Sequence, residues 1–201
     1  AGLAVGHHLA KHDVDFVILD ANRRIGDSWR DRWDSLRLFT PARYSGLPGL
    51  SFPDSPGHFP DKDQVAAYLE RYVERFELPV RSDARVTTLR ADGSDFVVHT
   101  SHATYRARNV VVATGPFQHP RIPAMAGQLA PEIQQIHSHE DRSPFDLPDG
   151  DVLVVGAGNS GAQIALELSR SRNVTLAGRD LGRLPRRILG LDVSHWLWPV
   201  F

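Results

Sequence analysis

The sequence contains no cysteine, and this absence limits the chemistry that the chain can carry. It excludes disulfide scaffolds, thiolate zinc sites, cysteine nucleophiles and dithiol redox reactions within these residues. An excess of charge of one sign is also lacking, because 23 basic residues face 24 acidic ones and the formal net charge is -1. We therefore expect no nucleic-acid partner and no attraction to an anionic membrane.

Long apolar runs are absent as well, and we expect no leader peptide in these residues. No uninterrupted stretch approaches the roughly 18 residues of a membrane-spanning helix, and we expect a soluble, cytoplasmic protein. The 201 residues, 41% of them hydrophobic, suffice for one or two packed domains. No strand pattern precedes Leu3, and the apolar run His195–Phe201 ends the chain without a polar tail. We therefore expect a piece that is incomplete at both termini.

A glycine pattern in the last quarter of the chain indicates nucleotide binding. The apolar strand Val152–Val155 runs into a G-x-G-x-x-G turn, a helix to about Arg170 and a second strand over Val174–Ala177. Such a turn lets backbone N–H groups and the positive end of a helix approach a pyrophosphate, which any side chain would block. The predicted cofactor-binding residues of this unit are Gly156, Gly158, Asn159, Ser160 and Gly161.

The start of the chain repeats this pattern without its opening strand. A helix pattern over Leu3–His12 precedes a short strand that ends at Asp20, and Gly2 to Asp20 spans the same 18 positions as Gly161 to Arg179. Asp20 is suited to the ribose hydroxyls of FAD, whereas the Arg179 guanidinium suits the 2′-phosphate of NADPH. Arg186 and Arg187 either assist Arg179 or are simply exposed.

Between these units the sequence predicts a long ordered loop, a helix, a small sheet and a linker. The loop covers Ala21–Pro60, and the helix begins near Asp63 and ends before Pro79. Three short β-like runs over residues 86–106 predict an antiparallel meander, followed by a continuous buried strand over Asn109–Ala113. Residues 115–150 hold six prolines, which predicts a linker that crosses between domains. His137, His139 and the neighbouring acids do not converge by their spacing, so we expect no metal site.

An ordered set of motifs gives the chain a family resemblance. It resembles the class B flavin-dependent monooxygenases, which include flavin-containing, Baeyer-Villiger and YUCCA-type enzymes, and most of all bacterial CzcO-like oxidoreductases. The motifs that carry the resemblance are Ile25–Arg30, Leu36–Pro41, Leu47–Gly49, Ala113–Gly115, Arg121–Pro123, His137–Ser138 and the glycine turn.

The resemblance implies an α/β fold with two Rossmann-like dinucleotide-binding domains of the three-layer ββα type. The FAD-binding domain would cover residues 1–150, lack its first strand and carry the meander at about 84–108. An incomplete NADP-binding domain would cover 151–201. The residues implied to contact FAD are Gly2, Asp20, Ser28, Trp29, Arg37, Thr40, Val86, Ala113, Thr114 and Gly115.

The chemistry implied by the resemblance is hydride transfer from NADPH to the flavin, followed by reaction with O2 to a C4a-peroxyflavin that oxygenates a small organic substrate. No side chain stands out as a catalytic acid or base. The family fingerprint places Phe and Gly six and four residues before a His, where this chain has Pro131 and Ile133 before His137. Two alternatives therefore stay open, an NADPH-dependent flavin reductase or oxidase and an inactive nucleotide-binding fragment.

Overall fold

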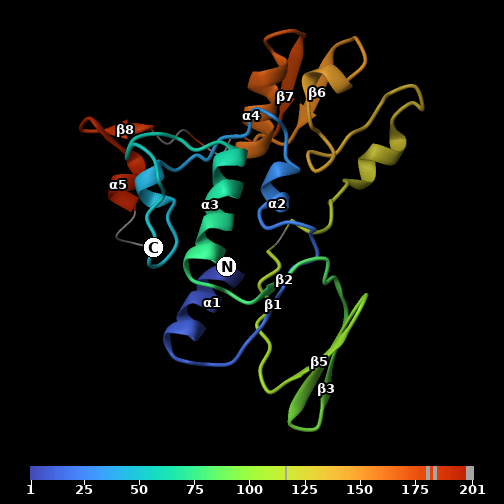
Figure 1. The fold of residues 1–201 in the computed structure, drawn as a ribbon. Coiled ribbons are helices and arrows are strands. Elements are labelled where there is room, and N and C mark those ends of the chain that lie inside the picture. The colour runs from blue at the N-terminus through green and yellow to red at the C-terminus, as the bar shows by residue number, and fades with distance from the viewer. Residues whose placement is uncertain (116, 180–181, 183–184, 198–201) are drawn as a thin grey trace. The chain divides into compact units, whose positions relative to one another are not determined.

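A computed structural model describes residues 1–115, 117–179, 182 and 185–197 of the chain (Figure 1). The described residues form two compact units. The first comprises residues 1–30, 47–51 and 63–119, and the second comprises residues 31–46, 52–62 and 120–201. The predicted cofactor domains, 1–150 and 151–201, follow a different boundary and stay a prediction.

The first unit combines a small parallel sheet with helices. Helix α1 (Gly2–Lys11) leads to β1 (Ile18–Leu19), which pairs in parallel with β2 (Val80–Arg81). Between these strands lie the short helix α2 (Asp27–Arg30) and the longer helix α3 (Lys62–Arg75). The helix predicted near Asp63 is confirmed, and β1 is shorter than the predicted strand.

Helix α3 supplies much of the core of the first unit. Val65, Ala66, Tyr68 and Tyr72 are buried on one stripe of the helix, at the spacing that brings residues three and four apart together. The hydroxyl of Tyr72 donates to the Pro48 carbonyl at 2.6 Å. Burial, and secondarily the neighbouring Tyr68, raise the pKa of Tyr72 to about 12.

The predicted meander is confirmed as a three-stranded antiparallel sheet. It consists of β3 (Val86–Asp92), β4 (Asp95–Thr100) and β5 (Thr104–Ala107), in that order. The strand predicted over Asn109–Ala113 is wrong, because these residues have no regular secondary structure. Val111 and Val112 are 61% and 72% exposed. An apolar run forms a strand only where another strand pairs with it, and none of the described strands does so here.

The second unit contains the predicted βαβ segment. Strand β6 (Val152–Val155), helix α4 (Asn159–Leu168) and strand β7 (Val174–Ala177) follow one another, and the two strands pair in parallel. Figure 1 shows α4 packed against this pair of strands. Its buried residues Ile164, Ala165 and Leu168 form the contact face, so the predicted strands and helix are confirmed.

Irregular chain and short elements make up the rest of the second unit where the structure describes it. Among these described residues lie the 3-10 helices η1 (Ala42–Tyr44), η2 (Ala124–Gln128) and η3 (Pro144–Asp146). A hairpin of β8 (Arg187–Ile188) and β9 (Leu191–Asp192) leads into α5 (Val193–Leu197). Within the described part of the chain, no helix combines the length and apolar character required to cross a membrane.

Candidate cofactor-binding site

The glycine turn between β6 and α4 has the geometry that a nucleotide site requires. Gly156 adopts φ +113°, and its N–H donates to the Ala177 carbonyl at 2.7 Å. A Cβ on Gly161 would overlap the carbonyl oxygen of Gly156. A Cβ on Gly178 would lie 2.5 Å from the backbone nitrogen of Ala157. Side chains at these positions would force the turn apart.

The turn is also open toward a ligand. Gly156, Gly158, Asn159 and Ser160 are exposed, and Gly158 caps α4 without a side-chain hydrogen bond to the helix. The first N–H groups of a helix have no partner within the helix and carry partial positive charge. The turn therefore presents donors where a pyrophosphate would fit, at the carboxyl end of β6.

Arg179 lies two residues beyond β7, at the same carboxyl edge of the small sheet. It is exposed, and no described carboxylate pairs with it. Its guanidinium is therefore available to an anionic group that approaches this edge.

The structure brings Gly2 and Ala113 together in the first unit. Gly2 opens α1, and a Cβ at that position would lie 3.7 Å from the Cβ of Ala113. Asp20 follows β1, and its Oδ1 accepts from the backbone and side-chain nitrogens of Asn22, each at 2.9 Å. The carboxylate is thereby fixed at the carboxyl end of a parallel strand, where the predicted ribose contact requires it.

Ser28 and Trp29 lie in the short helix α2. Ser28 is exposed, Trp29 is half-buried, and the N–H of Trp29 donates to the Gly26 carbonyl at 2.8 Å. Gly26 adopts φ +87°, and a Cβ there would lie 2.8 Å from the Cα of Ala66 on α3. Sequence reasoning missed this role of Gly26, although a glycine two residues before Ser28 was its signal.

Arg37 and Thr40 belong to the second unit, whereas the other residues predicted to contact FAD belong to the first. Gln163 of α4 holds the main chain of Arg37 from both sides. Its Oε1 accepts from the Arg37 N–H at 3.2 Å, and its Nε2 donates to the Arg37 carbonyl at 2.9 Å. Thr40 closes a turn, with its hydroxyl 3.1 Å from that of Ser45. Nothing in the sequence pattern singled out Gln163.

Three further predicted residues are exposed, and the structure does not gather them into one site. Val86 opens β3 and pairs with Thr100. Thr114 and Gly115 lie in irregular chain, where the Thr114 carbonyl accepts from the side chain of Gln118 at 2.5 Å. Gly115 adopts φ +73°, a conformation that favours glycine. Their contacts with a cofactor stay a prediction.

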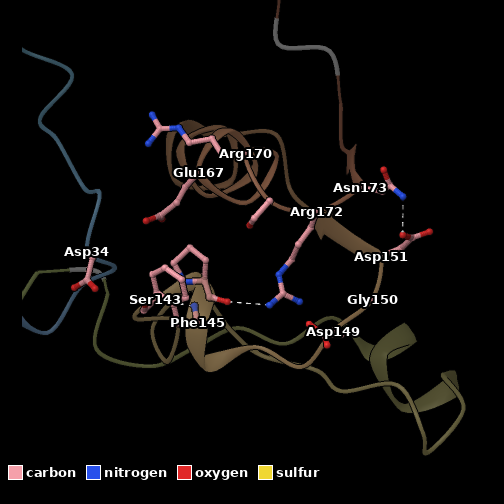
Figure 2. Close-up of a pocket in the computed structure, with 12 residues that line it drawn as sticks. Asp34, Ser143, Phe145, Asp149, Gly150, Asp151, Glu167, Arg170, Arg172 and Asn173 are labelled. Carbon is pink, nitrogen blue, oxygen red and sulfur yellow. Dashed lines mark hydrogen bonds between the residues drawn. The ribbon is translucent and has the colours of Figure 1, made fainter.

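A cavity of about 850 Å³ lies at the opposite end of the βαβ segment. Figure 2 shows Glu167 of α4 and Arg170, just beyond the end of α4, on one side of it, and Asp149 and Asp151 before β6 on another. These residues lie at the amino ends of β6 and β7, whereas ligands of parallel sheets bind at the carboxyl ends. The cavity is therefore not the nucleotide site.

Arg172 lines this cavity, and Asp141, outside the lining, is affected by the charge of the lining residue Glu167. The Arg172 guanidinium donates to the carbonyls of Pro144 at 3.0 Å and Leu147 at 2.8 Å, and also to that of Pro148. Nearby, burial and the charge of Glu167 raise the pKa of Asp141 above its ordinary value. Arg172 thus fixes the end of the linker with its positive charge.

A parallel strand, glycine turn, helix and strand with this geometry define a Rossmann-type α/β fold. The chain belongs to the pyridine nucleotide-disulphide oxidoreductase family, whose family model matches residues 1–201. The α/β fold predicted from the sequence is thereby confirmed.

Relatives and solved structures support this assignment. The chain is 46% identical over 197 residues to a CzcO-like oxidoreductase of Geobacillus kaustophilus, covering 98% of the chain and 57% of the relative. It is 34% identical over 220 residues to the indole-3-pyruvate monooxygenase YUCCA4 of Oryza sativa subsp. japonica, covering 98% and 50%. A flavin-containing monooxygenase from Stenotrophomonas maltophilia superimposes with a TM-score of 0.87 at 31% identity, covering 98% and 59%.

These matches confirm the resemblance to class B flavin-dependent monooxygenases and CzcO-like oxidoreductases. The chain spans 57% of the length of the Geobacillus relative and 59% of the Stenotrophomonas structure.

Proposed function

We propose that this chain is the nucleotide-binding part of an FAD- and NADPH-dependent monooxygenase that uses O2 to oxygenate a small organic substrate. The observation that carries the proposal is the open glycine turn between β6 and α4, joined to an exposed arginine at the end of β7. This turn occurs in a chain whose relatives include enzymes named as monooxygenases. We place the enzyme in the cytoplasm, where NADPH is available as reductant.

The NADPH site would be built by the second unit. The N–H groups at the start of α4 would hold the pyrophosphate, because Gly156 and Gly158 border open space and carry no side chain that would block its approach. Arg179 would bind the 2′-phosphate through charge-assisted hydrogen bonds. The fit rests on the open space beside Gly156 and Gly158 and on helix donors that lack a side-chain cap.

The FAD site is proposed on the residues that the sequence motifs single out. Gly2 would lie at the pyrophosphate, and the Asp20 carboxylate would accept hydrogen bonds from the adenosine ribose. Ser28, Trp29, Arg37 and Thr40 would lie on the flavin side of the cofactor. The remaining predicted contacts are Val86, Ala113, Thr114 and Gly115.

When bound, FAD and NADPH supply the redox chemistry, namely hydride transfer and activation of O2. The described residues contribute binding and orientation. The Asp20 carboxylate is already oriented by Asn22, and the Arg37 main chain is held by Gln163. Such preformed positions lower the entropic cost of binding the cofactors.

A second candidate is a flavin reductase or oxidase that consumes NADPH without oxygenating a substrate. It is favoured by Pro131 and Ile133, which replace the Phe and Gly of the monooxygenase fingerprint before His137. Product analysis separates the two activities. A monooxygenase forms oxygenated product in proportion to NADPH consumed in air, whereas an oxidase forms hydrogen peroxide instead.

The test follows NADPH oxidation by the purified holoprotein with sulfide, amine and ketone substrates, and compares wild type with Arg179→Gln. Loss of charge-assisted bonds worth about 1.5–3 kcal/mol raises the KM for NADPH roughly 10- to 100-fold and leaves that for NADH unchanged. Arg90→Gln, an equal charge change on the exposed face of β3 in the first unit, is the matched control. Equal use of NADH and NADPH by wild type would contradict the role of Arg179.

A further inference from the structure

The second unit contains another pocket, whose lining includes Arg186 and Arg187 but neither Arg179 nor any residue predicted to contact FAD. It has a volume of about 220 Å³ and is formed by the η1 segment, residues 56–59 and the β8–β9 hairpin with α5. Pockets for drug-sized ligands run from roughly 300 to 1,000 Å³, so this one suits a smaller molecule and not a whole dinucleotide. Tyr44 joins the two sides, because its hydroxyl lies 3.1 Å from Nδ1 of His195.

The lining of this pocket is positively charged. Arg43, Arg186 and Arg187 face a single lining carboxylate, that of Asp192. Arg186 pairs with Asp192 at 3.1 Å, and the side chain of Asp192 is 19% exposed. Burial raises the pKa of Asp192, but hydrogen bonds from Ser194 and the charges of Arg186 and Arg187 outweigh it, and the net pKa is lowered. One carboxylate faces three arginines, so the lining keeps a net positive charge.

Arg186 also packs against the aromatic ring of Phe59, which lines the pocket. Its guanidinium carbon lies 4.0 Å from the centroid of the Phe59 ring, a distance at which a cation is attracted to the ring face. Arg43 and Arg187 have no carboxylate partner of this kind among the described ion pairs. The pocket thus combines aromatic side chains, Tyr44 and Phe59, with an excess of arginines over carboxylates.

The pocket lies on the same stretch of chain as residues assigned to the flavin. Pro41, which lines it, directly follows Thr40, and Ser45 donates to the Pro41 carbonyl at 3.0 Å. A turn closed in this way holds Arg43 and Tyr44 at a fixed separation from Thr40. A molecule bound here would therefore have a fixed place relative to that segment.

We propose that this pocket binds the anionic group of a small planar organic substrate, with Arg43 and Arg187 as the residues that select for negative charge. The planar part would lie against Tyr44 and Phe59, since flat apolar groups pack well on aromatic rings. The proposal rests on the proposed monooxygenase function, because it makes the bound molecule the substrate. The same chemistry, a flat ring with an anion, also occurs in the 2′-phosphoadenosine part of NADPH.

The experiment measures binding without turnover, by isothermal titration of the holoprotein with phenylacetate and with phenylacetamide. The two probes share size and shape and differ in charge. Wild type is expected to bind phenylacetate at least tenfold more tightly, and Arg43→Gln/Arg187→Gln is expected to lose this preference. Arg43→Lys/Arg187→Lys keeps the charge and retains part of the preference, and Arg90→Gln, in the first unit, retains all of it.

A third titration, with adenosine 2′-monophosphate, distinguishes a pocket for an anionic substrate from a pocket for the 2′-phosphoadenosine part of NADPH. The proposal expects Arg179→Gln to weaken this nucleotide while leaving phenylacetate unaffected. Competition between the nucleotide and phenylacetate, with loss of both in the double glutamine variant, would assign the pocket to NADPH and overturn the proposal. Equal affinity of wild type for acid and amide would overturn it as well. Because no turnover is needed, failure of NADPH oxidation would contradict the proposed function and leave this result intact.

Discussion

Replacing Gly178 by alanine tests whether the glycine turn is as tightly packed as the structure requires. The added Cβ would lie 2.5 Å from the nitrogen and 2.7 Å from the Cβ of Ala157, inside the turn. Ordinary carbon contacts begin near 3.4 Å, so the turn must move by roughly 0.9 Å. The closest neighbour is backbone, and no flexible side chain can absorb the shift. We expect a loss of about 1–3 kcal/mol of stability, as for other overpacked sites.

The same displacement is expected to weaken NADPH binding. Good N–H···O distances span only about 0.5 Å, from 2.7 to 3.2 Å, so a shift of roughly 0.9 Å breaks bonds from the turn. Loss of one charge-assisted bond, worth about 1.5–3 kcal/mol, raises the Kd roughly 10- to 100-fold. Titration of NADPH fluorescence measures the Kd, and thermal unfolding followed by circular dichroism measures the stability.

Two further glycine variants separate packing from ligand contact. A Cβ at Gly158 or at Gly127 would meet nothing within 4 Å. Gly158→Ala is therefore expected to keep the melting temperature and still lose NADPH affinity, because its methyl group projects where the pyrophosphate would lie. Gly127→Ala in η2 should change neither quantity. A Gly178→Ala protein with wild-type stability and a Kd within threefold of wild type would refute the reasoning.

Three other perturbations have defined outcomes. Burial raises the pKa of Tyr72 to about 12 from an ordinary value of 10.0, so the protonated hydroxyl contributes fully to stability below pH 10 and this contribution is lost between pH 10 and 12. Tyr72→Phe should therefore lower the free energy of unfolding by about 1 kcal/mol at pH 8 and reduce the additional loss of stability at pH 11. Urea titrations at both pH values would measure these changes. Arg172→Ala should free the carbonyls of residues 144–148 and speed proteolysis there, with Arg170→Ala as control; equal cleavage rates would contradict its anchoring role. Gln163→Leu should lower the free energy of unfolding by about 1–2 kcal/mol through its two lost bonds to Arg37, and a change below 0.3 kcal/mol would argue against that clamp.

Sequence patterns predicted the second nucleotide unit well because local signals agreed there. The apolar run of β6 stops at a glycine turn that only a few backbone conformations allow, and the amphipathic helix and second strand follow at fixed spacing. The predicted bounds of β6 and β7, residues 152–155 and 174–177, match those observed. Local sequence and packing specify the same structure in this segment.

Elements that depend on distant partners were not predictable in this way. The run Asn109–Ala113 has the composition of a buried strand, but composition cannot show whether a neighbouring strand pairs with it. Strand β2 is only two residues long and too short for any periodic pattern. Gln163 resembles any polar residue on a helix, and its partner Arg37 lies 126 positions away. Such contacts arise from the tertiary fold.

The clamp between Gln163 and Arg37 also has a thermodynamic consequence. Helix α4 begins at the glycine turn, and one turn of helix later it carries the side chain that holds the Arg37 main chain. A ligand that shifts α4 must therefore carry the Arg37 segment with it or break two hydrogen bonds, at about 1 kcal/mol each. Linkage makes this coupling reciprocal, so a molecule that stabilises the Arg37 segment alters nucleotide affinity by the same factor.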